Sequence, residues 1–243
     1  MESKANTATM LTVQSVNQFY GESHILWDMS LQVPSGSCTC LMGRNGVGKT
    51  TLLKAIMGLL PIRNGSIQLQ HTDLPRLPAH QRAQLGIGYV PQGRDIFPQL
   101  TVEENLLVAL STRRDKIRQI PARIFELFPV LKSMLGRRGG DLSGGQQQQL
   151  AIMRALVGMP DLLLLDEPSE GIQPSIVHDI GTVLKRYAEE RHLTILLVEQ
   201  NLDLVNILAS RALFMENGQI AETLSDMGRL ASDDTLIHRY LSV

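Results

Sequence analysis

The chain has 243 residues, of which 43% are apolar and 19% are charged, and its formal net charge is −1. This length and apolar fraction are enough for one large α/β domain with a buried core, and they exclude a disordered chain. The near-neutral charge gives no electrostatic reason to expect nucleic acid or an acidic membrane surface as a partner.

Strand patterns dominate the N-terminal part of the chain. Residues 1–10 are polar and lack the apolar core of a signal peptide. Cys38 and Cys40 lie two apart in an apolar run, so they point to the same face of a strand and a disulfide between them would be strained. We expect buried, reduced cysteines, as is typical of a reducing cytoplasm. Three short strands are expected, at residues 11–16, 31–33 and 37–41.

Helix and strand patterns alternate after the glycine-rich loop at residues 43–50. A helix is expected at residues 51–57, ending at Gly58. Asn64-Gly65 is expected to form a turn before a strand at residues 66–70. A further strand is expected at residues 86–90.

Helical patterns continue from about residue 101 to residue 158 and indicate a helical insertion between sheet strands. The basic cluster in this segment is expected to form a solvated helix face. It consists of Arg113, Arg114, Lys116 and Arg118. Breaks between helices are expected at Pro121, Pro129 and Gly139-Gly140.

The C-terminal part returns to strands. The continuous apolar runs at residues 162–165 and 194–198 predict parallel strands covered on both faces. Both runs are far shorter than the roughly 20 residues that span a bilayer. A hairpin is expected with its turn at Asn217-Gly218, and a short helix is expected from Ser232, with Ser232 or Asp233 as its cap.

A glycine-rich loop lies between an expected strand and an expected helix, which is the context of a phosphate-binding P-loop. Its backbone N–H groups and the helix N-terminus are expected to converge on the phosphates of a nucleotide. Lys49 is expected to reach the β- and γ-phosphates, and the Thr50 hydroxyl to bind Mg²⁺. The alternative is a chance glycine turn. The expected nucleotide-binding residues are Gly43, Arg44, Asn45, Gly46, Val47, Gly48, Lys49, Thr50 and Thr51.

An acidic pair follows the apolar run at residues 162–165. A carboxylate at the carboxyl edge of a buried strand can hold Mg²⁺ through water, which suits Asp166. Glu167 is then placed to accept a proton from, or to polarise, the attacking water. The alternative is that the pair caps a helix before Pro168.

A second glycine-rich motif consists of Leu142-Ser143-Gly144-Gly145-Gln146. Ser143 is the expected N-cap of the helix that follows, and the exposed glycine backbone makes this helix N-terminus a second anion-binding site. An ordinary glycine-rich cap is the alternative. Together the two glycine motifs indicate an ATPase whose sites are completed by a second copy or a partner chain.

The order of these motifs is similar to that in the ATP-binding subunits of ABC transporters, and the resemblance covers about residues 11–222. In that family two such domains meet head to tail and hold ATP between the P-loop of one and the second motif, the signature motif, of the other. The resemblance implies that Tyr20 stacks on adenine, with a core strand aromatic as the alternative. It implies that Gln92 contacts Mg²⁺ or the water and transmits the nucleotide state to a membrane partner, with a polar strand end as the alternative. The residues implied to act on the opposite subunit's nucleotide are Ser143, Gly144, Gly145 and Gln146.

The patterns and the resemblance predict an α/β fold, namely a P-loop NTPase core with a mainly parallel sheet, an N-terminal antiparallel β-subdomain and an inserted α-helical subdomain. One domain is expected to cover residues 1–243. We expect the nucleotide-binding core at about residues 10–92 and 159–222, the helical subdomain at about 95–158, and a C-terminal extension at about 223–243.

A finer resemblance concerns the branch of the family. The P-loop and residues 88–98 and 166–172 look like those of branched-chain amino acid and urea importers, and residues 97–105 and 146–149 look closest to a urea-type subunit. The implied function is an ATP-hydrolysing subunit of an importer for urea, short amides or branched-chain amino acids, at the cytoplasmic face of the membrane. The implied ligands are ATP and Mg²⁺. The implied partners are a second ATPase subunit, transmembrane permease subunits and, indirectly, a solute-binding protein.

Two residues depart from the family pattern. Gln200 follows the strand at residues 194–198, where most members carry a histidine that contacts the γ-phosphate, and an amide cannot switch charge as imidazole does. Gln173 stands where an aspartate is common, and His192 is expected in a turn or on the surface. These departures leave open a nucleotide-gated subunit with a weakly hydrolytic site in a heterodimer, with a homodimer as the other arrangement. A soluble ABC ATPase of DNA repair or translation is disfavoured, because the chain has neither a long coiled-coil insertion nor a second copy of the domain.

Overall fold

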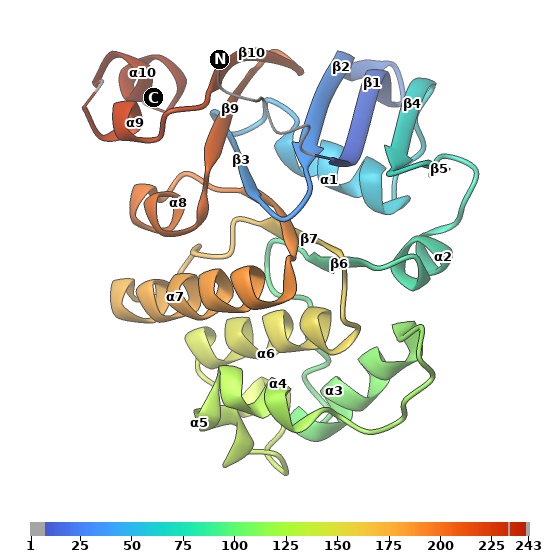
Figure 1. Cartoon of the computed structure of the whole chain (residues 1–243), viewed down its shortest axis with the longest axis vertical. Coiled ribbons are helices and arrows are strands. Elements are labelled where there is room, and N and C mark those ends of the chain that lie inside the picture. Colours follow the sequence, from blue (N-terminus) through green and yellow to red (C-terminus); the bar gives the residue numbers. More distant parts are fainter. Residues whose placement is uncertain (1–7, 233, 242–243) are drawn as a thin grey trace, which may run out of the picture.

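The computed structural model describes residues 8–232 and 234–241, and within them the strands form two sheets (Figure 1). The four-stranded sheet is antiparallel and has the order β2-β1-β4-β5. The six-stranded sheet has the order β10-β9-β3-β8-β7-β6, and its strands are parallel except for β10, which pairs antiparallel with β9. The strands are β1 (Thr9–Tyr20), β2 (Ser23–Pro34), β3 (Cys38–Met42), β4 (Asn64–Leu69), β5 (Thr72–Asp73), β6 (Ile87–Val90), β7 (Leu162–Asp166), β8 (Thr194–Val198), β9 (Arg211–Glu216) and β10 (Gln219–Leu224).

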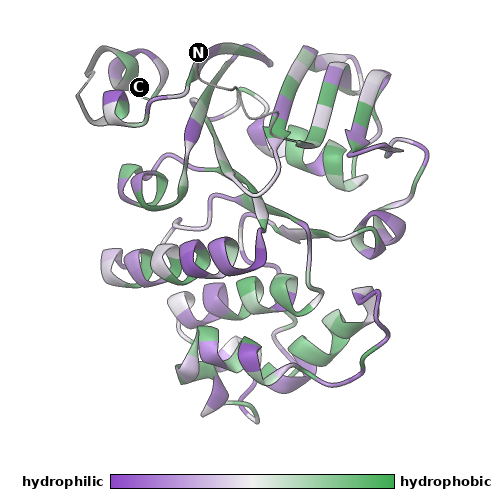
Figure 2. Ribbon diagram, in the orientation of Figure 1, coloured by the Kyte–Doolittle hydropathy of each residue, from purple (hydrophilic) through white to green (hydrophobic). Residues whose placement is uncertain are grey.

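The antiparallel sheet differs from the prediction in two places. Strands β1 and β2 are longer than predicted, and Figure 2 shows the hydrophobic and hydrophilic alternation along both. Ser15 and Asp28 have positive φ, and the register of β1 with β2 shifts between Val13 and Val16, so a bulge interrupts the alternation. The turn predicted at Asn64-Gly65 is wrong, because both residues belong to β4. A Cβ on Gly65 would lie 2.4 Å from the Ser15 carbonyl oxygen, so this glycine allows a close backbone approach.

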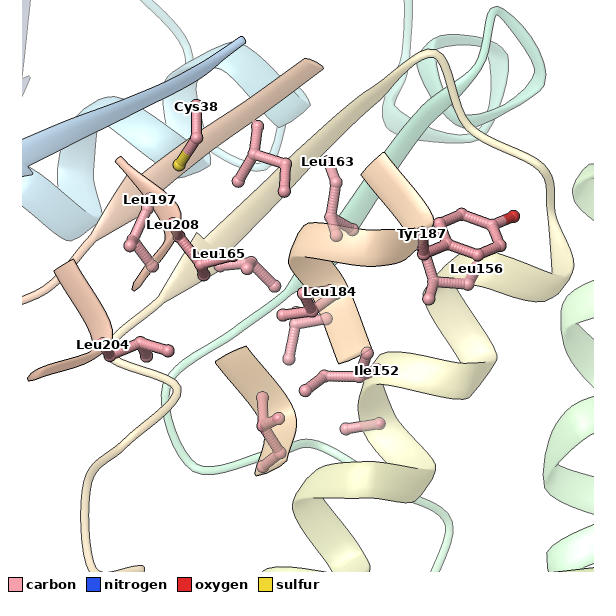
Figure 3. Close-up of a cluster of buried hydrophobic side chains, with 14 of the residues drawn as sticks. Cys38, Ile152, Leu156, Leu163, Leu165, Leu184, Tyr187, Leu197, Leu204 and Leu208 are labelled. Atoms are coloured by element: carbon pink, nitrogen blue, oxygen red, sulfur yellow. The ribbon is translucent and has the colours of Figure 1, made fainter. Parts of the chain in front are cut away.

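The parallel strands are buried on both faces, as the continuous apolar runs predicted. Leu163 and Leu165 belong to one hydrophobic cluster, which helices α6, α7 and α8 share, whereas Leu162 and Leu164 belong to a second cluster with α1 and the antiparallel sheet. Figure 3 shows the first cluster, with Leu163, Leu165 and Leu197 of the sheet close to Ile152 of α6 and Leu184 of α7. Cys38 and Cys40 are buried and free, as predicted.

The helices between β6 and β7 gather at one end of the molecule, and α7 lies between α6 and the sheet in Figure 1. The breaks predicted at Pro121 and Gly139-Gly140 are confirmed, because Pro121 is the N-cap of α4 and the two glycines form a 3₁₀ turn. Pro129 begins α5, a position that needs no N–H donor. The helices are α1 (Lys49–Met57), α2 (Ala79–Gln84), α3 (Val102–Ala109), α4 (Ala122–Leu127), α5 (Pro129–Lys132), α6 (Gly144–Val157), α7 (Pro174–Arg191), α8 (Leu202–Leu208), α9 (Gly228–Ser232) and α10 (Asp234–Tyr240), and the 3₁₀ turns are η1 (Leu110–Thr112) and η2 (Gly139–Asp141).

The predicted basic helix face at residues 113–118 is wrong. This segment is irregular, and Arg113 is buried, where its guanidinium donates to the Val157 carbonyl oxygen at the end of α6 and pairs with Asp115. Arg114 pairs with Asp161 at 2.8 Å. The free C-terminal carbonyl groups of α6 explain the burial of Arg113, because a helix end attracts a cationic donor.

The remaining C-terminal predictions fare differently. The hairpin turn at Asn217-Gly218 is confirmed between β9 and β10. The predicted terminal helix is α10, whereas α9 before it was not predicted. The predicted cap Ser232 is wrong, because this residue is the last of α9, and the other predicted cap, Asp233, lies outside the described residues. None of the helices in the described ranges is both long and apolar enough to traverse a bilayer.

Candidate functional site

The site begins where three neighbouring strands of the parallel sheet end. Strand β8 lies between β3 and β7, and Val198 pairs with Leu41 on one side and with Asp166 on the other. The loops that follow these strands therefore meet at one edge of the sheet, which is where open α/β sheets bind ligands. The loop after β3 is the glycine-rich loop, β7 ends in Asp166 and is followed by Glu167, and β8 is followed by Glu199 and Gln200.

The glycine-rich loop is shaped by close backbone contacts and leads into α1. Gly43 has φ 150°, and a Cβ there would lie 2.4 Å from the Met215 carbonyl oxygen. Gly48 is the N-cap of α1, with φ 107°, and a Cβ there would meet side chains at 3.0 Å. Only glycine fits both positions, so the loop holds its backbone at the N-terminus of α1, the arrangement that binds phosphate.

Lys49 spans this loop. Its buried ammonium group donates hydrogen bonds to the carbonyl oxygens of Gly43 at 2.6 Å and Arg44 at 2.9 Å. Nζ also lies 3.8 Å from Oε1 of Glu167. Burial lowers the pKa of Lys49, and the nearby carboxylates of Glu167 and Asp166 oppose that shift. The Lys49 ammonium is therefore held against the glycine-rich loop, where it could form ion pairs with the phosphates of a nucleotide.

Asp166 is held by two hydroxyl groups. Thr50 Oγ1 donates to Asp166 Oδ1 at 3.0 Å, and the Tyr89 hydroxyl lies 3.5 Å from Oδ2. Burial raises the pKa of Asp166, since removal from water penalises the charged carboxylate, and the hydrogen bond from Thr50 works against the shift. A cation bound beside this buried carboxylate would stabilise its charged form.

The residues present fit a magnesium ion. Thr50, Asp166 and Gln92 offer hydroxyl, carboxylate and amide oxygens, the hard ligands that Mg²⁺ prefers. Across residues 8–232 and 234–241 no group of three or more histidine, cysteine, aspartate or glutamate side chains could hold a metal without further ligands.

The predicted catalytic residues converge on Glu167. This residue has φ 47°, and its backbone N–H donates to the Val198 carbonyl oxygen at 2.9 Å, which fixes it against the end of β8. Gln92 Nε2 lies 3.3 Å from Oε2 of Glu167, and Gln200 Nε2 lies 3.3 Å from Oε1. Lys49 approaches the same Oε1. The structure thus brings Lys49, Gln92, Glu167 and Gln200 together.

Three residues of the site were missed by the sequence reasoning. Glu170 accepts a hydrogen bond from Gln92 at 3.0 Å, Tyr89 approaches Asp166, and Glu199 is buried between the loops after β7 and β8. Glu199 carried a usable signal, because it follows a buried strand just as Glu167 does. The roles of Tyr89 and Glu170 depend on contacts between segments far apart in the sequence.

The signature motif lies at the start of α6, and Tyr20 lies at the end of β1. Ser143 caps α6 in a capping box with Gln146, as predicted for its cap role, and Arg94 donates to Gln147 in the first turn of α6 at 3.1 Å. Tyr20 ends β1 and is 47% exposed, so it is not a core aromatic.

A cleft of about 760 Å³ opens beside the Mg²⁺-type ligands. It is lined by Thr50, Asp166 and Gln92, and also by Val108 of α3 and Arg154 of α6. The segment after Gln92 is attached to α6, because Arg154 donates to the Asp95 carbonyl oxygen at 2.7 Å and stacks over the Phe97 ring at 4.6 Å. The cleft therefore connects the nucleotide side of the sheet with the helical segment.

The fold and site define a P-loop nucleoside triphosphatase. The glycine-rich loop follows a central parallel strand, its lysine and threonine open a helix, and the carboxylate pair ends a strand of the same sheet. A family model described as "ABC transporter" matches residues 26–170. The chain belongs to the ABC transporter family and is an ATPase of that family.

Relatives and solved structures agree with this assignment. The chain is 42% identical over 212 residues to the high-affinity branched-chain amino acid transport ATP-binding protein BraG of Pseudomonas aeruginosa, covering 87% of this chain and 91% of the relative. It is 37% identical over 213 residues to the probable branched-chain amino acid transport ATP-binding protein LivF of Archaeoglobus fulgidus, covering 87% and 90%. A crystal structure of an ABC transporter ATP-binding cassette in its ADP conformation matches with a TM-score of 0.79 at 28% identity, covering 95% of this chain and 97% of that one. A nucleotide-free cassette matches with a TM-score of 0.78 at 27% identity, covering 94% and 97%. The predicted ABC ATPase fold is confirmed.

Proposed function

We propose that this chain is the ATP-hydrolysing subunit of an ABC importer and works with Mg²⁺. The observation that carries the proposal is the meeting of Lys49, Gln92 and Gln200 around the Glu167 carboxylate, beside the Thr50–Asp166 pair. Phosphoryl transfer to water needs positioning and charge neutralisation more than covalent chemistry, and this residue set supplies both.

We assign the nucleotide phosphates to the P-loop. The backbone N–H groups at the start of α1 and the Lys49 ammonium bind the β- and γ-phosphates. The phosphates then replace the carbonyl oxygens of Gly43 and Arg44 as the acceptors of the Lys49 hydrogen bonds. Thr50, Asp166 and Gln92 hold Mg²⁺, which neutralises phosphate charge when bound. Tyr20 is exposed at the end of β1 and offers an aromatic face to adenine.

Glu167 is the general base in this proposal. It accepts a proton from the attacking water as the water oxygen bonds to the γ-phosphorus, and the bond to the ADP oxygen breaks. Gln92 and Gln200 each donate an amide hydrogen to this carboxylate and keep both of its oxygens oriented. Neither amide can take the proton itself, so the base role falls to Glu167.

The signature motif serves a partner's nucleotide. Ser143 caps α6 and Gly144 begins it, and we assign this helix N-terminus to the ATP that a second ATPase subunit brings. The resemblance to head-to-tail family dimers supports this arrangement. Gln200 at the histidine position favours a heterodimer with two unequal sites, and a homodimer is the competing arrangement.

The cleft beside Gln92 is the proposed contact with the permease. It joins the nucleotide side to α3 and α6, and the loop from Gln92 to Pro98 runs along it. A cytoplasmic helix of a transmembrane subunit seated there would sense the state of the nucleotide, and this would place the chain at the cytoplasmic face of the membrane. The division into a core at about residues 10–92 and 159–222, a helical subdomain at about 95–158 and an extension at about 223–243 belongs to the same proposal.

The proposed solute is a branched-chain amino acid, delivered by a solute-binding protein. The names of the relatives BraG and LivF support it. Urea or short amides are the competing solutes, supported by the resemblance of residues 97–105 to a urea-type subunit. ATP hydrolysis by the transporter purified with its permease, measured with leucine and with urea on the binding protein, separates them, because only the cognate solute stimulates the rate.

A second candidate function is a nucleotide-gated subunit that clamps ATP and hydrolyses it poorly. The amide of Gln200 favours it, because most family members have at this position a histidine, whose imidazole can change charge. The Gln200→His exchange in the assembled transporter tests it. A large rise in the hydrolysis rate would support a weakly hydrolytic site, whereas an unchanged rate supports a competent one.

A further inference from the structure

Glu199 is a buried carboxylate to which the motifs give no role. It directly follows β8, between Val198 and Gln200, and it is 3% exposed. Its Oε1 accepts the backbone N–H groups of Gln200 at 2.7 Å and Asn201 at 2.9 Å, and its Oε2 accepts the backbone N–H of Ser169 at 3.2 Å. Hydrogen bonds of this kind to an ionised acceptor are the strong ones, and together they compensate the burial of the charge.

These contacts join two loops through one side chain. Ser169 lies two residues after Glu167, in the loop that leads to Gln173 and α7, whereas Gln200 and Asn201 form the loop that leads to α8. The Glu199 side chain therefore links the loop of the general base with the loop of Gln200. Only a carboxylate meets both sets of donors, because an amide would turn an N–H group toward backbone N–H donors on one side.

The contacts of Glu199 affect the proposed catalytic site because they help to orient the Gln200 side chain. Its amide donates to Asn45 Oδ1 at 2.8 Å and to Glu167 Oε1 at 3.3 Å, so it connects the P-loop with the general base. The Gln200 backbone N–H is the group that Glu199 holds most closely. Catalytic groups must be held within a fraction of an ångström of their working positions, and they depend on supporting residues for this.

We infer that Glu199 is a positioning residue, which locks the loops after β7 and β8 to each other and so keeps Gln200 directed at Glu167 and the P-loop. The inference deepens the proposed function and rests on it. Glu199 touches neither nucleotide nor water in this scheme and acts through Gln200.

The test is a double-mutant cycle in the transporter purified through a tag on this chain. Glu199→Gln keeps the shape of the side chain, and we expect kcat to fall about tenfold while the Kd for Mg-ATP stays within about twofold, a loss in the transition state alone. In a Gln200→Ala background the same exchange should cost less than about twofold, because residues acting as one unit give non-additive effects. The matched control, Glu189→Gln on the exposed side of α7, should leave both quantities unchanged.

Each outcome decides the question. Single-turnover hydrolysis, followed long enough to resolve a thousandfold loss, keeps every variant measurable, and binding of Mg-ATP reports whether the variant is folded. An unchanged kcat for Glu199→Gln, an equal loss in both backgrounds, or a loss that appears only in Kd would overturn the inference. If Glu199→Gln fails to fold, Glu199→Asp replaces it, and its loss must again vanish without Gln200. A wild-type transporter without ATPase activity would instead overturn the proposed function.

Discussion

The side-chain amide of Gln200 lies 3.3 Å from Glu167 and donates a hydrogen bond to its Oε1. The same amide donates to Asn45 of the P-loop at 2.8 Å. The residue at the position where the family usually has histidine thus contacts both the proposed general base and the glycine-rich loop. An amide donates without changing charge, so this contact has the same strength at every pH at which Glu167 is ionised.

We predict that Gln200→Ala lowers kcat about tenfold, since the lost hydrogen bonds are worth about 1 kcal/mol or more each. The Kd for ATP should change little. Gln200→His should restore most of the rate at pH 8 and add a step near pH 6.5, where imidazole becomes charged beside Glu167. A pH–rate profile of each variant checks this, with the wild-type profile as the control. A wild-type-like rate for Gln200→Ala would refute the role of the amide.

We predict that Gly43→Ala abolishes nucleotide binding. A Cβ at this position would lie 2.4 Å from the Met215 carbonyl oxygen, and the backbone has φ 150°, so the loop must shift away from β9. Gly136→Ala is the matched control, because no atom lies within 4 Å of a Cβ there. Titration with a fluorescent ATP analogue compares the two variants. Equal affinities would show that the loop tolerates the displacement.

We predict that Arg82→Ala lowers the free energy of unfolding by about 3 kcal/mol. Arg82 is 4% exposed, and its guanidinium donates to the carbonyl oxygens of Leu77, Ala55 and Ile56, the last two at the C-terminal end of α1. The variant removes this donor from all three carbonyl groups, of which Ala55 still accepts the Gly58 N–H at 3.2 Å. Urea unfolding measures the change.

The control for that prediction is Arg76→Ala. The Arg76 side chain is 89% exposed and pairs with Asp73 at 3.7 Å, and exposed pairs contribute about 0–1 kcal/mol. A similar loss in both variants would mean that charge removal, and not the carbonyl contacts of Arg82, sets the effect.

We predict that Asp166→Asn makes the nucleotide-free protein more stable at pH 7. Because burial raises the pKa of Asp166, the fold favours its protonated form. The contribution of this group to stability is present below its ordinary pKa and is lost as the pH rises through the raised pKa, so the charged carboxylate destabilises the fold at higher pH. The variant removes the cost, and the gain should disappear below about pH 4.

Thermal unfolding at pH 7 and pH 4 checks this, with and without Mg-ATP. Asp166→Asn should have the higher Tm without ligand and the smaller Tm increase with Mg-ATP, because it has lost a magnesium ligand. A lower Tm without ligand at pH 7 would contradict the pKa argument. Such an exchange of stability for ligand binding is common at functional sites.

Much of the fold could be predicted from the sequence because its signals are local. The buried runs of β7 and β8, the glycine that ends α1 and the Asn217-Gly218 turn each act within a few residues. The turn predicted at Asn64-Gly65 is wrong because the close approach of Gly65 to Ser15 is a contact between strands that no local pattern contains. The solvated helix face predicted around Arg113 is wrong for the same reason, since Arg113 donates to the Val157 carbonyl oxygen, which is 44 residues away.

The residues of the candidate site likewise divide into those in contiguous motifs, which the sequence predicted, and those joined by long-range contacts, which no local pattern predicted. The P-loop and the Asp166-Glu167 pair are contiguous motifs and could be read directly. The support of Glu167 by Gln92 and Gln200 joins positions 75 and 33 residues distant, and only the resemblance suggested that they meet. Glu199 was overlooked because a single carboxylate after a strand has many explanations until its backbone partners are seen.

The most direct test of the central claim is ATP hydrolysis by the Glu167→Gln variant in the transporter purified with its membrane partners. The amide keeps the size of the side chain and removes the base, so turnover should fall at least about a hundredfold, while Mg-ATP should bind at least as tightly as to the wild type. Undiminished hydrolysis by this variant would contradict the account.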